Sequence, residues 1–125
     1  MAQILVAEDD DSMRTFLAGA LRRAGHAVET ASDGFEALSC LARHKYDVLL
    51  ADVVMPGMDG VELARRASRD QPQIKVMFIT GFAAVALRGR SGMPGDPKIL
   101  SKPFHLKDLV SQIDQLLAQR QPAGA

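Results

Sequence analysis

Three acidic residues stand where the chain leaves two short apolar segments, and together they could hold a divalent cation. Glu8 and Asp9 follow the apolar run 4–7, and Asp52 follows the apolar run 48–51. If both runs are parallel strands of one sheet, their carboxyl ends meet at the same edge, where ligands of such sheets bind. Three carboxylates in one place repel each other and need a cation, and Mg²⁺ prefers such hard oxygen ligands. The spacing therefore predicts a Mg²⁺ site formed by these side chains.

Two more polar residues end two further apolar runs. Thr80 follows the run 76–79, and Lys102 comes shortly after the apolar pair 99–100. The lysine would add a second positive charge to the acidic group, and the threonine hydroxyl would offer a hydrogen bond to oxygens bound there. A carboxylate beside a metal, a lysine and a hydroxyl can attack a phosphoryl group as a nucleophile. The two cations would stabilise charge on the transferred oxygens, so we expect phosphoryl chemistry at this edge.

Each of these residues has an ordinary explanation when it is taken alone. An acidic run such as residues 8–11 is usually a solvated loop with a helix cap, and a single aspartate such as Asp52 is more often structural than nucleophilic. Lys102 alone would be a surface charge, and Thr80 alone a hydroxyl at a strand end. The functional interpretation depends on the combination, because four strand ends each supply matching chemistry.

The hydrophobic pattern predicts the elements that would bring these residues together. Short apolar or alternating runs indicate strands, whereas apolar residues three or four apart indicate helices. The expected strands cover residues 4–7, 27–31, 48–52, 76–80 and 99–100, and the expected helices cover 11–24, 34–44, 59–69, 82–87 and 106–117. Asp11 should cap the first helix and Gly25 should end it, while Asp59 and Glu62 resemble a capping box at the third. Glycines and prolines in 88–97 should keep the fourth helix short.

This order of elements predicts an α/β fold. Strands alternating with helices indicate a parallel sheet, and apolar runs without alternation suit central strands covered on both faces. We expect a flavodoxin-like doubly wound five-stranded parallel sheet with strand order 2-1-3-4-5. The chain should form one domain over residues 1–118, followed by a flexible tail over 119–125.

The composition excludes several classes of protein. The 125 residues include 15 basic and 15 acidic side chains, so the zero formal charge gives no electrostatic reason for binding nucleic acid or an anionic membrane. One cysteine, Cys40, excludes an internal disulfide. The sequence shows neither a secretory leader nor the apolar run of about 20 residues that spans a bilayer. We expect a soluble cytoplasmic protein without a DNA-binding extension.

The ordered motifs resemble the receiver domains of two-component response regulators. The likeness covers residues 3–118 and is carried by four motifs in the expected order and spacing: 4–10, 52–60, 79–81 and 101–104. The resemblance implies that Asp52 accepts phosphate from a histidine kinase or a histidine phosphotransfer protein. It also implies a signalling domain rather than an enzyme, with self-phosphorylation and self-dephosphorylation as its only chemistry.

The resemblance further assigns roles at the site. It implies a Mg²⁺ site formed by Asp52, Asp9, Glu8 through water and the backbone carbonyl of Val54. Thr80 and Lys102 would contact the phosphoryl oxygens. The peptide bond between Lys102 and Pro103 would be cis, which is chemically reasonable because X–Pro bonds adopt cis at low cost.

A narrower likeness concerns the output. Residues 77–87 and 100–106 are similar to a stand-alone type of receiver that, when unphosphorylated, helps deliver cell-cycle substrates to the ClpXP protease. The output would then be a contact made by the receiver itself. Because Ile99 stands where many receivers have a switching aromatic residue, we expect the signal to leave through the 80–82 loop and the apolar fourth helix. The apolar stripe of that helix fits either core packing or a docking patch.

Two other functions could use an acceptor aspartate of this kind. An aspartyl-phosphate phosphatase would need a second acid two residues after Asp52, where Val54 stands. A phosphorelay shuttle, passing phosphate to a downstream histidine protein, needs the same site as a switch, so the sequence does not separate the two.

Val54 and Phe82, two residues after the acceptor and after Thr80, can shield a phosphoryl group but cannot orient water. Slow self-dephosphorylation is therefore expected.

Overall fold

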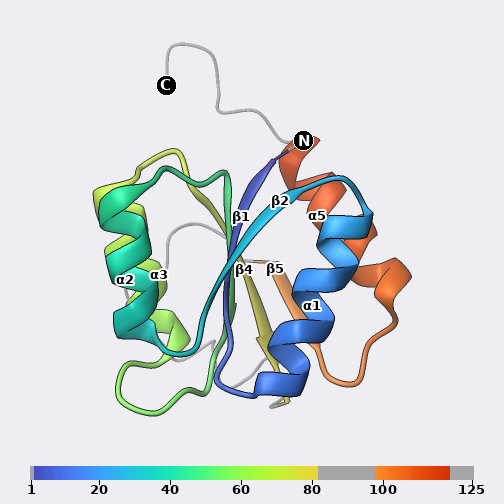
Figure 1. Cartoon of the computed structure of the whole chain (residues 1–125), viewed down its shortest axis with the longest axis horizontal. Coiled ribbons are helices and arrows are strands. Elements are labelled where there is room, and N and C mark those ends of the chain that lie inside the picture. Colours follow the sequence, from blue (N-terminus) through green and yellow to red (C-terminus); the bar gives the residue numbers. More distant parts are fainter. Residues whose placement is uncertain (1, 82–97, 119–125) are drawn as a thin grey trace.

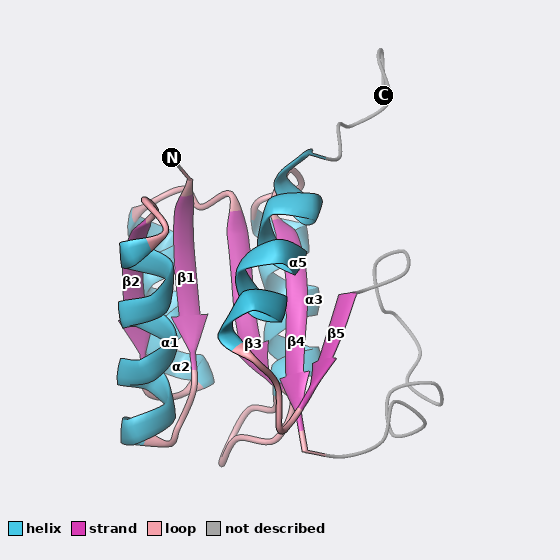
Figure 2. Cartoon of the chain, turned by 90° about the vertical axis from the view of Figure 1, so that its right-hand side faces the viewer, coloured by secondary structure: helices cyan, strands magenta, loops and turns pink. Residues whose placement is uncertain are grey.

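A computed structural model of the protein describes residues 2–81 and 98–118. In this part of the chain five strands form one sheet, all paired in parallel. The strands are β1 (Gln3–Ala7), β2 (Ala27–Ala31), β3 (Val48–Asp52), β4 (Lys75–Thr80) and β5 (Lys98–Ser101). Their order is β2-β1-β3-β4-β5, and Figure 2 shows them pointing the same way. The predicted flavodoxin-like sheet is confirmed.

Helices cover both faces of this sheet. They are α1 (Asp11–Arg23), α2 (Gly34–Arg43), α3 (Gly60–Asp70) and α5 (Leu106–Ala118). Helices α2 and α3 lie on one face, and α1 and α5 lie on the other (Figure 1). No helix among the described residues is both long and apolar enough to cross a membrane. The predictions for the fourth helix at 82–87, the loop at 88–97 and the tail at 119–125 fall outside the described residues.

Two apolar cores explain why the central strands lack polar alternation. Side chains of successive strand residues point to opposite faces. Leu5, Leu49 and Phe78 therefore pack in the core under α2 and α3. Val6 and Leu50 pack in the core under α1 and α5. Because both faces are covered, a strand in the middle of this sheet can be apolar at every position.

The helix starts follow capping rules, with one correction. Asp10, not Asp11, caps α1, because its Oδ1 accepts a hydrogen bond from the Met13 amide at 2.8 Å. The prediction of Asp11 was one residue late: a cap accepts from an amide two or three positions ahead, and Asp11 lies inside the first turn. Asp59 caps α3 as predicted, accepting from the Glu62 amide at 2.9 Å.

The ends of the elements agree with prediction to within one or two residues. Strands β1, β4 and β5 each begin with a polar residue that the apolar runs did not include. Backbone pairing extends to these residues because it does not depend on the side chain. Gly25 follows α1 with a φ of +100°, in the left-handed region that glycine favours at helix ends, and so ends the helix as predicted.

Helix α3 begins directly against the backbone of Asp52. The Gly60 amide donates a hydrogen bond to the Val53 carbonyl at 2.9 Å. A Cβ atom on Gly60 would lie 2.2 Å from the Asp52 carbonyl oxygen, far closer than atoms can approach. The absence of a side chain at Gly60 is therefore what allows the end of β3 and the start of α3 to meet.

We predict that Gly60→Ala lowers the free energy of unfolding by at least about 2 kcal/mol, because the added methyl must displace the Asp52 backbone. Urea denaturation measures this change. Gly19→Ala is the matched control. A Cβ there would meet only the end of the Arg23 side chain, at 3.4 Å, so it should stabilise α1 by about 0.5–1 kcal/mol. Equal effects of the two substitutions would contradict the close contact.

Candidate functional site

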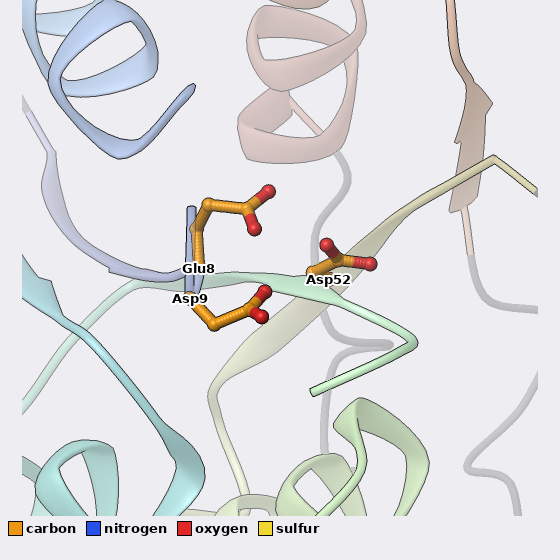
Figure 3. A group of neighbouring side chains, drawn as sticks. All are labelled: Glu8, Asp9 and Asp52. Atoms are coloured by element: carbon orange, nitrogen blue, oxygen red, sulfur yellow. The ribbon is translucent and has the colours of Figure 1, made fainter. Parts of the chain in front are cut away.

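Three carboxylates meet at the carboxyl ends of β1 and β3. Glu8 and Asp9 follow β1, and Asp52 is the last residue of β3. Each side chain contributes one oxygen to a group in which all ligand atoms lie within 4.8 Å of one another (Figure 3). The neighbouring strands β1 and β3 pair directly, which holds the two ends side by side. The structure thus brings together the three acids that the strand ends suggested.

Lys102 adds a positive charge to this group. Its Nζ lies 3.2 Å from Asp52 Oδ2 and 3.5 Å from Glu8 Oε1. It follows the last residue of β5, and the Lys102–Pro103 bond is cis, as the resemblance implied. Burial by itself lowers the pKa of Lys102, but the negative charges of Asp52 and Glu8 outweigh it and raise the pKa above its usual value. The ammonium group therefore stays charged beside the two carboxylates.

Glu8 is the most buried member of the acidic group, with 1% of its surface exposed. Its Oε2 accepts a hydrogen bond from the Asp10 amide at 3.2 Å. Burial raises the pKa of Glu8 to about 7; the Asp10 amide opposes this effect, and neighbouring Asp52 adds to it. The lysine alone does not offset this concentration of negative charge. The donor set, all hard carboxylate oxygens on a partly exposed edge, fits Mg²⁺.

Asp52 is oriented by two contacts. Its Oδ1 accepts a hydrogen bond from the Val54 amide at 3.1 Å, and its Oδ2 faces Lys102. The residue is 7% exposed, so little of it meets solvent. Val54, in the loop after β3, is 51% exposed, and its amide contact places it beside the Asp52 carboxylate. The predicted metal contact through the Val54 carbonyl stays a prediction.

Thr80 and Ile99 occupy neighbouring strands. Thr80 is the last residue of β4, is 1% exposed and pairs in register with Ser101 of β5. Its carbonyl accepts a hydrogen bond from the Lys102 amide at 2.8 Å, which ties the end of β4 to the start of the lysine segment. Ile99 is half-buried and packs against the core under α2 and α3. The predicted output route through residues 80–82 and the fourth helix falls largely outside the described residues.

One side chain at this site was not singled out from the sequence. Arg14 of α1 donates from Nη1 to the Glu8 carbonyl at 2.9 Å and pairs through Nη2 with Asp11. The position of Arg14 three residues after Asp11 on a helix was the available signal. A bond from a helix side chain back to a loop carbonyl has no periodic signature, so the contact with Glu8 could not be read from the sequence.

Two surface hollows lie near α1. One, of about 410 Å³, adjoins the site and is lined by Asp10, Ser12, Met13, Phe16 and Lys102. A larger groove, of about 590 Å³, lies between α1 and α5, and neither Lys102 nor any of the three acids of the site lines it. Phe16 is 46% exposed beside the smaller hollow. The smaller hollow is therefore the one connected with the chemistry.

Comparison with known proteins gives a consistent result. Residues 4–114 match the family described as the response regulator receiver domain. The response regulator receiver protein CpdR of Brucella abortus (strain 2308) is 54% identical over 117 residues, covering 94% of this chain and 98% of that protein. A part of the sensor kinase CckA of the same organism is 36% identical over 123 residues, covering 95% of this chain and 13% of the kinase. The crystal structure of a response regulator receiver protein from Sinorhizobium medicae WSM419 superposes with a TM-score of 0.87 at 30% identity, covering 95% of this chain and 96% of that one.

We predict that Mg²⁺ raises the thermal stability of the protein. A ligand that binds only the native state adds about 2.7 kcal/mol at a hundredfold excess over its Kd. Asp9→Ala should lose most of this gain, because it removes one of the three carboxylate oxygens that could bind the metal. Without metal, the variant should be at least as stable as wild type, since one like charge is gone. Differential scanning calorimetry with and without Mg²⁺ measures both effects.

Asp70→Ala serves as the control for that experiment, because it removes the same charge from an exposed position at the end of α3. It should keep the full Mg²⁺ effect. A wild-type response in Asp9→Ala would mean that the metal binds elsewhere.

Proposed function

Because this chain belongs to the family of response regulator receiver domains, we propose that it is a switch in which Asp52 accepts a phosphoryl group from a histidine kinase or a histidine phosphotransfer protein. Receiver domains are signalling domains rather than classical enzymes. The observation that carries the proposal is the contact of Asp52 with Lys102 inside a group of three carboxylates at the sheet edge. A buried aspartate with only a structural role would be paired with a cation or with hydrogen-bond donors, but not placed beside two further carboxylates.

The proposed transfer is a nucleophilic displacement at phosphorus. A carboxylate oxygen of Asp52 attacks the phosphorus of a phosphohistidine, and a new P–O bond forms as the P–N bond breaks. The imidazole leaves with the electron pair of that bond and takes up a proton from solvent. Lys102 is close enough to Asp52 to contact the transferred oxygens, and Thr80, at the end of the adjacent strand, is proposed to donate a hydrogen bond to them.

The acidic residues would hold the metal that receiver domains use. We assign Asp9 and Asp52 as direct ligands, Glu8 as a ligand through water and the Val54 carbonyl as a further ligand. A bound Mg²⁺ would supply positive charge toward the phosphoryl oxygens. Glu8 suits an indirect role, because its two oxygens already face the Asp10 amide and Lys102.

The consequence of phosphorylation would be a change in partner binding. The chain spans 98% of the length of CpdR at 54% identity, which supports an output of the same type. We propose that one phosphorylation state acts as a protease adaptor, with ClpXP as the candidate protease. Purified ClpX presented with the phosphorylated and the unphosphorylated chain would identify the active state.

A second candidate is a phosphorelay shuttle. It is favoured by the likeness to a part of the sensor kinase CckA, since that protein joins a receiver-like segment to a kinase. Both functions use the same acceptor. Transfer of labelled phosphate from Asp52 to a phosphotransfer protein would favour the shuttle, and its absence would favour the switch.

We predict that Asp52→Asn abolishes phosphorylation, because an amide is not a nucleophile of this kind. Incubation with acetyl phosphate and Mg²⁺ should add one phosphoryl group to the wild-type mass and none to the variant. Asp70→Asn, which changes an exposed aspartate of α3, should be labelled like wild type. Labelling of Asp52→Asn, or labelling of wild type that a chelator does not reduce, would refute the assignment.

We also predict that Val54→Asn shortens the lifetime of the phosphoryl group. The valine is half exposed beside Asp52 and offers water no hydrogen bond. A hydrogen bond that stabilises the attacking water by about 1.4 kcal/mol would accelerate the loss about tenfold. The decay is followed by mass spectrometry after the donor is removed. Val54→Ala, which adds no polar group, should have the smaller effect, and an unaltered lifetime in Val54→Asn would disprove the shielding.

A further inference from the structure

Arg14 connects helix α1 to the backbone of the acidic segment Glu8–Asp11. Its Nη1 donates to the Glu8 carbonyl at 2.9 Å, and its Nη2 pairs with the Asp11 carboxylate. Only 20% of the side chain is exposed, so the guanidinium lies against the segment rather than in solvent. The planar guanidinium has several donors in a fixed arrangement, and one arginine can therefore hold two acceptors at once.

The position of the Asp9 carboxylate depends on how this segment is held. Asp9 is exposed, unlike Glu8 and Asp52, so the surrounding core does not fix it. Glu8, the residue before it, is fixed by a hydrogen bond from its amide to the Ala31 carbonyl at 3.1 Å and by Arg14 on its own carbonyl. Asp10, the residue after it, is fixed as the cap of α1. The contact with Arg14 thus completes the restraint on the N-terminal side of Asp9.

Charge and geometry predict opposite effects of losing Arg14 on the affinity for Mg²⁺. A positive charge near a cation site repels the cation, so on charge alone the loss of Arg14 should strengthen Mg²⁺ binding. If the arginine instead fixes the segment, its loss should weaken binding, because the carboxylates are no longer held together. The sign of the change in affinity therefore separates the two effects.

We propose that Arg14 is a positioning residue of the metal centre, which holds the Glu8 carbonyl so that Asp9 stays within reach of Asp52. Arg14 does not touch the metal or the phosphoryl group in this proposal. Its role resembles that of groups that orient metal ligands from outside the coordination sphere. The inference rests on the proposed Mg²⁺ site.

The test is isothermal titration of the full chain with MgCl₂, without any phosphodonor. Arg14→Met should weaken Mg²⁺ binding about tenfold, the lower end of the usual loss when such an orienting group is removed. Arg14→Lys keeps the charge but presents a single ammonium, which cannot reproduce the two-point contact, so it should also bind more weakly than wild type. If charge alone mattered, Arg14→Lys would match wild type and Arg14→Met would bind more tightly.

Arg22→Met provides the matched control. Arg22 also lies on α1 and also donates to a backbone carbonyl six residues away, that of Val28 at 3.0 Å, but at the other end of the helix. The substitution Arg22→Met should lower the stability of the metal-free protein to a similar extent as Arg14→Met, while the Mg²⁺ affinity stays unchanged. Urea denaturation without Mg²⁺ measures the stability.

The outcomes distinguish this inference from the proposed function. Wild-type or tighter Mg²⁺ binding by both Arg14 variants would overturn the positioning role, and so would an equal loss of affinity in Arg22→Met. If wild type itself binds no Mg²⁺, or if Asp9→Asn binds it like wild type, the proposed metal site is wrong, and the role of Arg14 falls with it. Weaker Mg²⁺ binding in both Arg14 variants, with the wild-type affinity in Arg22→Met, supports the inference.

Discussion

The mutual repulsion of Glu8, Asp9 and Asp52 is the constraint on which the rest of this structure depends. Oxygens of all three lie within 4.8 Å of one another, which is unfavourable unless the backbone holds them there. The backbone can do so because β1 and β3 are adjacent central strands with an apolar core on each face. Folding energy gained from burial along the strands keeps like charges together at their ends.

The three acids differ in burial, and this difference suits the proposed Mg²⁺ site, whose ion would exchange with solvent. Glu8 and Asp52 are buried and share Lys102, whereas Asp9 is exposed. Two carboxylates are thus held in a fixed, partly neutralised arrangement, and the third faces solvent. This asymmetry follows from the chain leaving β1 at Glu8, so that consecutive residues differ in burial.

The sequence predicted the fold well because both strong signals were local. Apolar runs of four residues located β1, β3 and β4, and the polar residues after them located Glu8, Asp52 and Thr80. Lys102 was located by the shorter apolar pair 99–100. The failures were also local. Asp10 and Asp11 are chemically identical neighbours, so composition alone could not tell which one caps α1. The contact of Arg14 with a backbone carbonyl depends on the path of the loop, which no pattern of side chains records.

The place of Lys102 at the end of an edge strand has a mechanical consequence. Among the described residues β5 pairs with β4 alone, yet Lys102, which follows β5, forms ion pairs with Asp52 at the end of β3 and with Glu8, which follows β1. The Lys102 side chain therefore reaches past β4, and its ion pairs connect the edge of the sheet with its centre. A change in the charge or size of Asp52 would therefore act directly on Lys102, the residue that follows β5. The side chain that follows this edge strand is in this way coupled by charge to the centre of the sheet.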